Sequence, residues 1–428
     1  MDTIYALASA PGRAGVSIVR LSGPNAWAVV DGMAAPLPRP RQAALRVLRD
    51  QDGAFLDQAL VLIFEEGGSF TGEPVAEFHL HGSIAVQRAV LRAIGAFPGL
   101  RLAEPGEFTR RALETGSMDL TQVEGLSDLI DAETEVQRQQ ALKVLSGDLG
   151  ARVHDWRRSL VRAASLLEAT IDFADEDVPV DVSDEVRDLV TSVLREVKTE
   201  LAGLTVAERI RTGFEVAIVG PPNAGKSTLL NHLAGREAAI TSEIAGTTRD
   251  VLEVRMDING LPVVVLDTAG LRDTTDTVEA IGVARARARA DDADLRVHLV
   301  PPGEAPMIAV RPGDLVLTAK QDHPVDGING ISGQTGHGVE ALQRHIQETL
   351  AERVQRVSLS SRERHRIMLE DGGSLLADAL DLLQDGPDLY DVVSENVRVA
   401  ARRMESLLGY VDVEHLLDEI FANFCVGK

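Results

Sequence analysis

The chain has 428 residues, of which 44% are apolar, and a formal net charge of −23. This length predicts roughly two to four domains with ordinary buried cores. No stretch approaches the roughly 18 apolar residues of a membrane span and no signal-peptide pattern begins the sequence, so we expect a cytoplasmic protein. The acidic charge argues against indiscriminate nucleic-acid binding, so an RNA partner would need a local basic patch or a second protein.

The first part of the chain, residues 1–118, is predicted to be an α/β domain. Short β-rich runs cover residues 3–7, 16–21, 44–48, 59–64 and 76–81, and a helical pattern covers 83–96. Arg20 and Glu77 lie in or at the end of otherwise apolar strands, and the residues alone favour a solvated strand face for them. His79 and His81 alternate on one strand without further ligands nearby, so they predict no metal site.

From residue 119 the pattern becomes helical. Two apolar stripes at helical spacing predict long amphipathic helices. Their members are Leu142, Leu145, Leu149, Val153, Trp156 and Leu160 in one stripe, and Val186, Leu189, Val193, Val197 and Leu201 in the other. The acidic run at residues 172–179 predicts a solvated loop. Helical patterns return at residues 367–383, 394–407 and 413–424, so we expect helices from both chain segments to pack together around an insertion.

The insertion begins with a phosphate-binding motif, Gly220-Pro-Pro-Asn-Ala-Gly-Lys-Ser227. It follows an apolar run typical of a buried strand and precedes a helical pattern, which is the context that the G-x-x-x-x-G-K-[ST] spacing needs. Backbone N–H groups would bind phosphate oxygens, Lys226 would neutralise phosphate charge, and the Ser227 hydroxyl would bind Mg²⁺. The motif therefore predicts a nucleotide site.

Later motifs have the layout of a Ras-like GTPase. Two runs of strand residues flank Asn259-Gly260, which predicts a hairpin. Thr248, in Gly246-Thr-Thr-Arg-Asp250, would complete the Mg²⁺ site, and Asp267 would hold a metal-bound water. The Gly270 N–H would sense the γ-phosphate, so hydrolysis would release both loops.

Guanine recognition rests on Ala319-Lys-Gln-Asp322, because an Asp can accept hydrogen bonds from the guanine N1–H and amino group. The usual first residue of this motif is Asn, and here it is Ala319. Ile331-Ser-Gly-Gln-Thr335 stands, in altered form, where a second loop supports the base.

Leu271 occupies the position of the glutamine that orients water in Ras-type enzymes. Another group must take that role, and the candidates in the following loop are Asp273, Asp276 and Glu279. Positive charge for the transition state has several possible sources, namely Arg249, Arg272, a partner protein, or a monovalent cation held by Asn223.

Taken together, the motifs resemble the MnmE (TrmE) family of tRNA-modification GTPases over nearly the whole chain. Besides those above, the resemblance rests on Thr3-Ile-Tyr-Ala, Pro11-Gly-Arg-Ala-Gly-Val-Ser-Ile-Val-Arg20, Ser69-Phe-Thr-Gly-Glu73, Pro105-Gly-Glu-Phe-Thr109, Asp267-Thr-Ala-Gly-Leu-Arg272 and the terminal Phe424-Cys-Val-Gly-Lys428. It implies a folate-binding and dimerisation domain at residues 1–118, a helical domain from 119–211 and 351–428, and a G domain at 212–350.

The resemblance also implies a catalytic cycle in which K⁺-dependent pairing of G domains across a homodimer drives GTP hydrolysis. By position, Glu279 would orient water, with Lys226 and Asn223 as further catalytic residues, and Ser227 and Thr248 would bind Mg²⁺. The implied K⁺ ligands are Asn223, Ser242, Ile244 and Thr247. The implied GTP-binding residues are Asn223, Ala224, Gly225, Lys226, Ser227, Thr228, Ser242, Glu243, Ile244, Ala245, Gly246, Thr247, Thr248, Asp267, Thr268, Ala269, Gly270, Ala319, Lys320, Gln321, Asp322, Ser332, Gly333 and Gln334.

The folate site implied by the resemblance draws on Arg20, Glu77, Ser117 and Lys428, where Ser117 replaces the usual basic residue. With an FAD-containing partner, MnmG, in a heterotetramer, such proteins add an aminomethyl or carboxymethylaminomethyl group to the wobble uridine of certain tRNAs. The one-carbon donor would be 5-formyl- or 5,10-methylene-tetrahydrofolate.

Two further expectations and two rival functions remain. Residues 301–313 are too few and too proline-rich for the usual crossover helix, so that helix is expected to be short or lost. Cys425, the single cysteine, is either a reactive thiol or a small buried side chain. The rivals are a stand-alone GTPase switch in ribosome assembly and a folate-binding scaffold without turnover.

Overall fold

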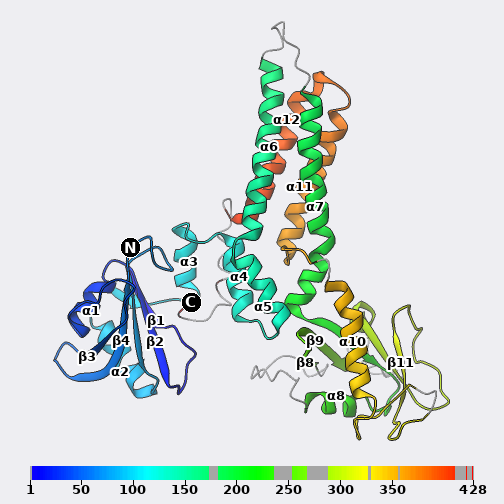
Figure 1. Ribbon diagram of the computed structural model, residues 1–428, viewed down its shortest axis with the longest axis horizontal. Helices are drawn as coiled ribbons and strands as arrows, with labels where there is room; N and C mark the ends of the chain where they lie inside the picture. The colour runs from blue at the N-terminus through cyan, green and yellow to red at the C-terminus, as the bar shows by residue number, and fades with distance from the viewer. Residues whose placement is uncertain are drawn as a thin grey trace, which may run out of the picture. The chain divides into compact units, whose positions relative to one another are not determined.

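A computed structural model describes residues 2–172, 182–235, 253–267, 288–325, 329–354, 357–409, 421 and 427 (Figure 1). The chain divides into two compact units. One contains Met1–Ser127 together with Ser406–Lys428, and the other contains Asp128–Glu405. The C-terminal segment therefore belongs to the same unit as the N-terminus.

The first unit is built on a six-stranded sheet with the order β3-β4-β5-β2-β1-β6. All neighbours are antiparallel except β1 and β6. Its strands are β1 (Thr3–Leu7), β2 (Val16–Ser22), β3 (Ala44–Arg49), β4 (Phe55–Phe64), β5 (Val75–His81) and β6 (Leu100–Leu102). Its helices are α1 (Ala26–Ala34), α2 (Ile84–Gly95), α3 (Glu107–Glu114) and the greater part of α4 (Leu120–Ile130), whose end from Asp128 belongs to the second unit. Every strand predicted for residues 1–118 is confirmed, whereas α1, β6 and α3 were not predicted from the sequence.

One face of this sheet is apolar because its strands alternate. In β4 the side chains of Ala59, Val61 and Ile63 are buried, and the residues between them face the other way. The buried side chains pack with those of α1 and α2 into one core. The opposite face carries Arg20, Glu77 and His79, all half-buried.

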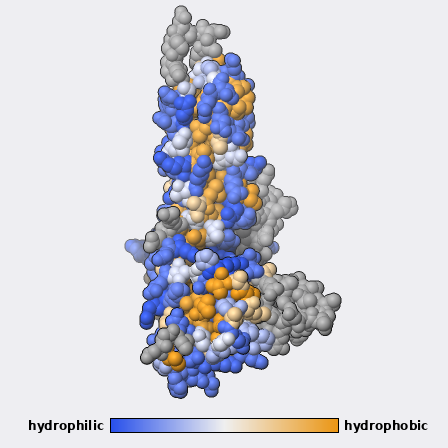
Figure 2. Space-filling view, turned by 90° about the vertical axis from the view of Figure 1, so that its right-hand side faces the viewer, coloured by the Kyte–Doolittle hydropathy of each residue, from blue (hydrophilic) through white to orange (hydrophobic). Residues whose placement is uncertain are grey.

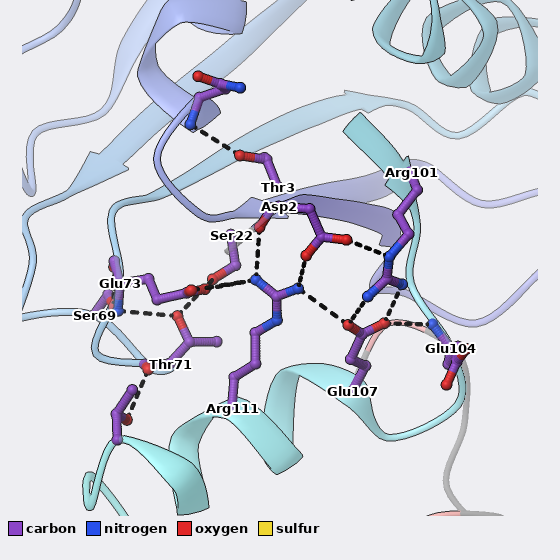
Figure 3. Close-up of polar contacts among 12 residues, drawn as sticks. Asp2, Thr3, Ser22, Ser69, Thr71, Glu73, Arg101, Glu104, Glu107 and Arg111 are labelled. Atoms are coloured by element: carbon purple, nitrogen blue, oxygen red, sulfur yellow. Dashed lines mark hydrogen bonds and ion pairs between the residues drawn. The ribbon is translucent and has the colours of Figure 1, made fainter. Parts of the chain in front are cut away.

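A polar cluster joins the start of β1, β6, α3 and the loop before β5 (Figure 3). The Arg111 guanidinium donates to Asp2 at 2.8 Å, to Glu73 at 3.1 Å and to Glu107 at 3.1 Å. Arg101 binds both Asp2 and Glu107. Burial by itself would raise the pKa of Asp2 and Glu107, but the hydrogen bonds from both arginines hold each pKa below its ordinary value. The cluster fixes α3 against the sheet through charge, and Phe108 of α3 adds apolar packing against Ile4 and Ala6 of β1.

The second unit contains a helical bundle whose members come from both sides of the nucleotide sequence motifs. Helices α6, α7, α11 and α12 pack together, and α5 precedes α6. Figure 2 shows an apolar strip running between mostly hydrophilic helix surfaces in the upper part of this view. The bounds are α5 (Glu135–Leu145), α6 (Asp148–Asp172), α7 (Ser183–Thr212), α11 (Glu363–Leu382), the 3₁₀ helices η1 (Pro387–Leu389) and η2 (Ser406–Leu408), and α12 (Tyr390–Glu405), with η2 assigned to the first unit. The expected packing of flanking helices is confirmed.

The first predicted stripe is wrong in one respect. It was expected to lie on one long helix, but residues 146–147 separate α5 from α6, and Leu142 is 39% exposed. From Leu149 to Leu160 the stripe is buried as predicted, with Trp156 at its centre. The acidic run beyond Asp172 and the helical pattern at residues 413–424 lie outside the described residues, apart from Phe421.

The inserted nucleotide domain has a six-stranded sheet with the order β12-β11-β10-β7-β9-β8, in which only β8 and β9 are antiparallel. Asn259 and Gly260, both at positive φ, form the predicted hairpin turn between β8 and β9. The elements are β7 (Phe214–Val219), α8 (Lys226–Ala234), β8 (Glu253–Ile258), β9 (Leu261–Asp267), β10 (Leu295–Val300), β11 (Leu315–Ala319), β12 (Gly330–Ile331) and α10 (Val339–Val354). The predicted combination of α/β domains with a helical domain is confirmed.

The connection between the parallel strands β10 and β11 contains no helix, as the short crossover predicted. A buried ion cluster holds it instead. Arg296 donates to Asp314 at 3.1 Å and to the Ala309 carbonyl at 3.0 Å, and His298 Nε2 lies 2.9 Å from Asp314. Hydrogen bonding thus replaces the packing that a crossover helix would have supplied. Among the described helices, none is long and apolar enough to pass through a bilayer.

Candidate functional site

The phosphate loop connects the buried end of β7 to the N-terminus of α8. Asn223 at φ 64° and Gly225 at φ 96° turn the chain, so that α8 begins at Lys226. Lys226 is buried, and its Nζ donates to the carbonyls of Gly220 at 2.8 Å and Pro221 at 3.1 Å. Its ammonium group therefore lies inside the loop that would surround a phosphate.

A candidate cation site, which we call the cation corner, is formed by Ser227 and Asp267 beside the phosphate loop, where β9 ends. The Ser227 hydroxyl donates to Asp267 Oδ2 at 2.7 Å. Asp267 is 2% exposed, and its Oδ1 has no hydrogen-bond partner. A buried carboxylate oxygen without a partner is costly, and a hard cation with oxygen ligands would satisfy it. The residues that are described here fit Mg²⁺.

The base pocket is a cavity of about 300 Å³ between the start of α8 and the loops after β11 and β12. Ser332 Oγ donates to Asp322 Oδ1 at 2.7 Å, which orients the carboxylate predicted to bind guanine. The pocket is lined by Ala224, Gly225, Thr228, Leu229, Leu299, Ala319, Lys320, Asp322, Ile331, Ser332, Gly333 and Gln334. Gln321 stands outside this lining, and Leu229 and Leu299 were not predicted, because nothing in their spacing marks them.

The glycine at position 333 of the second base-supporting loop has a steric reason. A Cβ at this position would lie 2.5 Å from the backbone nitrogen of Leu229, closer than real Cβ atoms come. The first turn of α8 therefore approaches the loop so closely that only glycine fits. Ala319, which is 1% exposed, contributes a similarly small side chain to the neighbouring wall of the pocket.

The structure brings the described nucleotide residues together at one edge of the parallel sheet, beyond the carboxyl ends of β7, β9 and β11. Ligands bind at this edge in open α/β sheets. The other predicted residues lie outside the described part of the chain, namely Ser242, Glu243, Ile244, Ala245, Gly246, Thr247, Thr248, Thr268, Ala269, Gly270 and Glu279.

A second candidate site lies on the first unit, where Arg20 of β2 pairs across the sheet with Glu77 of β5. Arg20 Nε donates to Glu77 Oε1 at 2.9 Å, and its guanidinium lies 5.5 Å from the Phe70 ring and 5.9 Å from the Phe108 ring. His79 Nε2 is 3.3 Å from Glu77 Oε2. The two carboxylate oxygens of Glu77 are thus both engaged. The solvated strand face that the residues alone favoured is wrong, because the pair is only 23% and 15% exposed.

The positions of the other predicted residues of this second site follow from their neighbours. Ser117 bonds to the Thr115 hydroxyl at 3.1 Å. Gly427 packs against the end of β1, because a Cβ on it would lie 2.1 Å from the Leu7 carbonyl oxygen. Leu7 follows Ala6, which pairs with Arg20, so the end of the chain reaches the strand beside that arginine. Lys428 itself lies outside the described residues, as does Cys425.

The two histidines of β5 bind carboxylates. His81 Nδ1 lies 2.7 Å from Asp57 Oδ1, and His79 contacts Glu77. Across the described residues, no group of three or more His, Cys, Asp or Glu side chains is arranged to hold a metal ion.

Comparison with known proteins gives full-length matches. A family model for the GTP-binding protein TrmE N-terminus matches residues 3–117, and one for the MnmE helical domain matches residues 120–425. The tRNA modification GTPase MnmE of Roseobacter denitrificans is 58% identical over 428 residues, and that of Cereibacter sphaeroides is 57% identical over 431, with 100% of both chains covered in each case. A solved G domain, from the T. maritima FeoB iron transporter, matches 33% of this chain and 99% of its own at 17% identity, with a TM-score of 0.20. On the matches to both family models and to the full-length relatives, the chain belongs to the MnmE (TrmE) family of tRNA modification GTPases.

Proposed function

We propose that the chain is a K⁺-dependent GTPase that works with an FAD-containing MnmG partner on the wobble uridine of certain tRNAs. The pair would add a carboxymethylaminomethyl or aminomethyl group to C5, taking one carbon from 5-formyl- or 5,10-methylene-tetrahydrofolate. We assign the domains as 1–118 for folate and dimerisation, 119–211 with 351–428 for the helical domain, and 212–350 for the G domain. The proposed assembly is a cytoplasmic homodimer that joins MnmG as a heterotetramer.

One observation supports the proposed binding of GTP. The buried Lys226, the partnerless oxygen of Asp267 and the Asp322 carboxylate lie around a single edge of the G-domain sheet. These three groups would bind phosphate, Mg²⁺ and guanine respectively. When bound, Mg²⁺ would neutralise charge on the terminal phosphates.

Hydrolysis needs two groups that Ras-type enzymes supply differently. Leu271 has no polar atom to orient water, so we assign that role to Glu279, in the loop that follows it. We assign the cation position to Asn223 together with Ser242, Ile244 and Thr247 from the opposite loop. Asn223 is exposed at the rim of the phosphate loop, which is where a monovalent ion would need a ligand. K⁺ there would add positive charge as negative charge develops on the transferred phosphate.

The folate half rests on Arg20 and Glu77, joined by Ser117 and Lys428. The Arg20 guanidinium is held in place by Glu77 and by two aromatic rings, so it can present its remaining N–H groups to an anionic or carbonyl-rich ligand. The nearby chain end would deliver Lys428 to the same place.

The primary test measures phosphate release from GTP in K⁺ and in Na⁺, with ATP as the specificity control. We expect GTP to be hydrolysed in K⁺ but not in Na⁺, and we expect no hydrolysis of ATP. Glu279→Ala is expected to keep GTP binding and lose hydrolysis, whereas Asp276→Ala, a carboxylate of the same loop, keeps both. Equal rates in the two salts would overturn the K⁺ assignment, and a fully active Glu279→Ala variant would overturn the assignment of water orientation.

The second test adds MnmG, tRNA, tetrahydrofolate donor and NADH, and measures modified uridine by mass spectrometry. We expect modification that depends on GTP hydrolysis and is lost in Glu77→Gln, because the amide cannot balance the Arg20 charge. Hydrolysis of GTP in that variant should be unchanged. Robust GTP hydrolysis without any uridine modification would instead favour a stand-alone switch.

A further inference from the structure

The carboxylate of Glu77 lies between two nitrogen donors on the face of the first unit's sheet that is turned away from the α1–α2 core. Arg20 Nε donates to Glu77 Oε1 at 2.9 Å, and His79 Nε2 lies 3.3 Å from Glu77 Oε2. The proposed folate site includes Arg20 and Glu77 but not His79. The contact between His79 and Glu77 is therefore a feature of that site without an assigned role.

Strand register explains why His79 contacts Glu77. The two residues are two positions apart on β5, so both side chains leave the same face of the sheet. Ile18 of β2 and Leu60 of β4 stand directly opposite His79, and neither apolar side chain can donate or accept a hydrogen bond. The ring of His79 therefore turns to Glu77, and both side chains are largely covered, at 26% and 15% exposed.

The two contacts leave the Glu77 carboxylate with a defined capacity for a ligand. An ionised carboxylate can accept about four hydrogen bonds, two at each oxygen. Arg20 takes one position on Oε1 and His79 takes one on Oε2, so one acceptor position remains on each oxygen. Two parallel acceptors of this kind match a planar ligand group that carries two adjacent N–H donors.

We propose that His79 is a positioning residue of this site, and that the ligand presents two adjacent N–H donors to Glu77. The 2-amino group and the N3–H of the tetrahydrofolate ring form such a pair, so the inference rests on the folate binding of the proposed function. His79 holds Glu77 Oε2 as Arg20 holds Oε1, which fixes the plane of the carboxylate before the ligand binds. A carboxylate held at one oxygen alone would rotate about its terminal torsion and would have to be ordered on binding.

The first test measures the affinity of the full-length chain for 5-formyl-tetrahydrofolate by calorimetry. His79→Leu removes the donor and should weaken binding at least about tenfold, because Glu77 loses a hydrogen bond that its charge strengthens. His79→Gln keeps an N–H donor at a similar reach and should bind within about threefold of wild type. His81→Leu is the matched control, since His81 stands on the same strand face but bonds to Asp57, and it too should bind within about threefold of wild type.

The second test separates positioning of Glu77 from a general effect on the sheet. It uses two 5,8-dideazafolates that differ only at position 2 of the ring, where one has an amino group and the other a methyl group. The wild-type chain should bind the methyl compound at least about tenfold more weakly, because one acceptor position of Glu77 is left without a donor. In His79→Leu the same exchange should cost less than about threefold, since Glu77 is no longer aligned with the donor pair.

Three results would overturn the inference alone, namely unchanged affinity in His79→Leu, an equal loss in His81→Leu, or the same discrimination between the two dideazafolates in wild type and His79→Leu. Weak binding by His79→Gln would show that the ring matters for packing and not as a donor, which also overturns it. Absence of folate binding by the wild-type chain would refute the proposed folate site and this inference with it. Both leucine variants should hydrolyse GTP at the wild-type rate, since the nucleotide site belongs to the other unit.

Discussion

At the scale of single residues, the base pocket has two small residues in its lining, Ala319 and Gly333. Ala319 stands where the motif usually has Asn, and at Gly333 the backbone of Leu229 in the first turn of α8 leaves no room for a Cβ. Asp322, whose carboxylate accepts a hydrogen bond from Ser332, is the proposed guanine ligand. In the proposed site, guanine recognition therefore depends on one carboxylate, without a side-chain amide at position 319.

We expect Ala319→Asn to tighten GDP and GTP binding by about two- to tenfold, because one added hydrogen bond contributes about 0.5–1.5 kcal/mol. Titration with a fluorescent guanine nucleotide measures this directly. Ala319→Leu is the matched control, since it fills the same space without a polar atom and should weaken binding. An Asn variant with unchanged or lower affinity would mean that the loop geometry already supplies that contact.

Asp314 gives a pH-dependent prediction. Burial alone would raise its pKa, but hydrogen bonds from Arg296, the Arg311 backbone and His298 hold its pKa below the ordinary value of 3.8. A lowered pKa means that the carboxylate stabilises the fold above pH 3.8 and that this stabilisation is lost as pH falls below it.

Asp314→Asn should therefore lower the free energy of unfolding near neutral pH by about 1–3 kcal/mol, because it removes one of the two carboxylates that pair with the buried Arg296 and leaves only Asp291. The difference from wild type should stay constant from about pH 7 to 5 and shrink as pH falls below about 4. Urea unfolding at each pH measures it. A difference that does not shrink in acid would show that packing, not charge, sets the cost.

Sequence reasoning placed single residues on the correct elements where the spacing of a motif is fixed. The phosphate loop was predicted between a buried strand and a helix and Asp267 at a strand end, and the structure has them between β7 and α8 and at the end of β9. Pairing of Arg20 with Glu77 was not predicted from the residues, since strand register decides which residues face each other. Leu229 and Leu299 line the base pocket without any distinguishing pattern, so only the folded chain reveals them.

At the scale of elements, helix prediction failed where an apolar stripe is short and interrupted by buried charges. Helix α3 has eight residues, and its buried side chains include Glu107 and Arg111, both 8% exposed, beside Phe108 and Ala112, so two apolar positions alone gave too little periodicity to predict from. The loss or shortening of the crossover helix, expected at residues 301–313, is confirmed, because so few residues between two parallel strands leave little room for a helix.

The C-terminal segment is an element whose docking can be tested through Gly427. Its φ of 99° and its approach to the Leu7 carbonyl exclude any side chain. We expect Gly427→Ala to displace the chain end from β1 and to weaken tetrahydrofolate binding by at least about tenfold, by removing Lys428 from the proposed site. Binding is measured by calorimetry.

Gly53→Ala is the control for this substitution, because Gly53 also has a positive φ of 82° but has open space where a Cβ would stand. It carries the backbone strain without the steric conflict, so folate binding should be retained. GTP hydrolysis should be unchanged in both variants. Normal folate affinity in Gly427→Ala would show that the chain end plays no part in that site.

At the scale of the whole molecule, the two compact units carry different proposed ligands. The phosphate loop, cation corner and base pocket all belong to Asp128–Glu405, whereas Arg20, Glu77 and Gly427 belong to the other unit. A chain with two compact units is expected to depart from two-state unfolding. Each unit should then respond to its own ligand, because only a ligand that binds the folded form of a unit stabilises it.

The two tryptophans allow each unit to be followed separately, since Trp27 belongs to the first unit and Trp156 to the second. We expect GDP at about 100 times its Kd to stabilise the Trp156 transition by about 2.7 kcal/mol and to leave the Trp27 transition unchanged. Urea unfolding of the Trp27→Phe and Trp156→Phe variants, monitored by the remaining tryptophan, measures each. ADP is the matched control and should shift neither. If GDP moved both transitions equally, the units would unfold as one cooperative body and nucleotide binding would be coupled to the folate unit through stability itself.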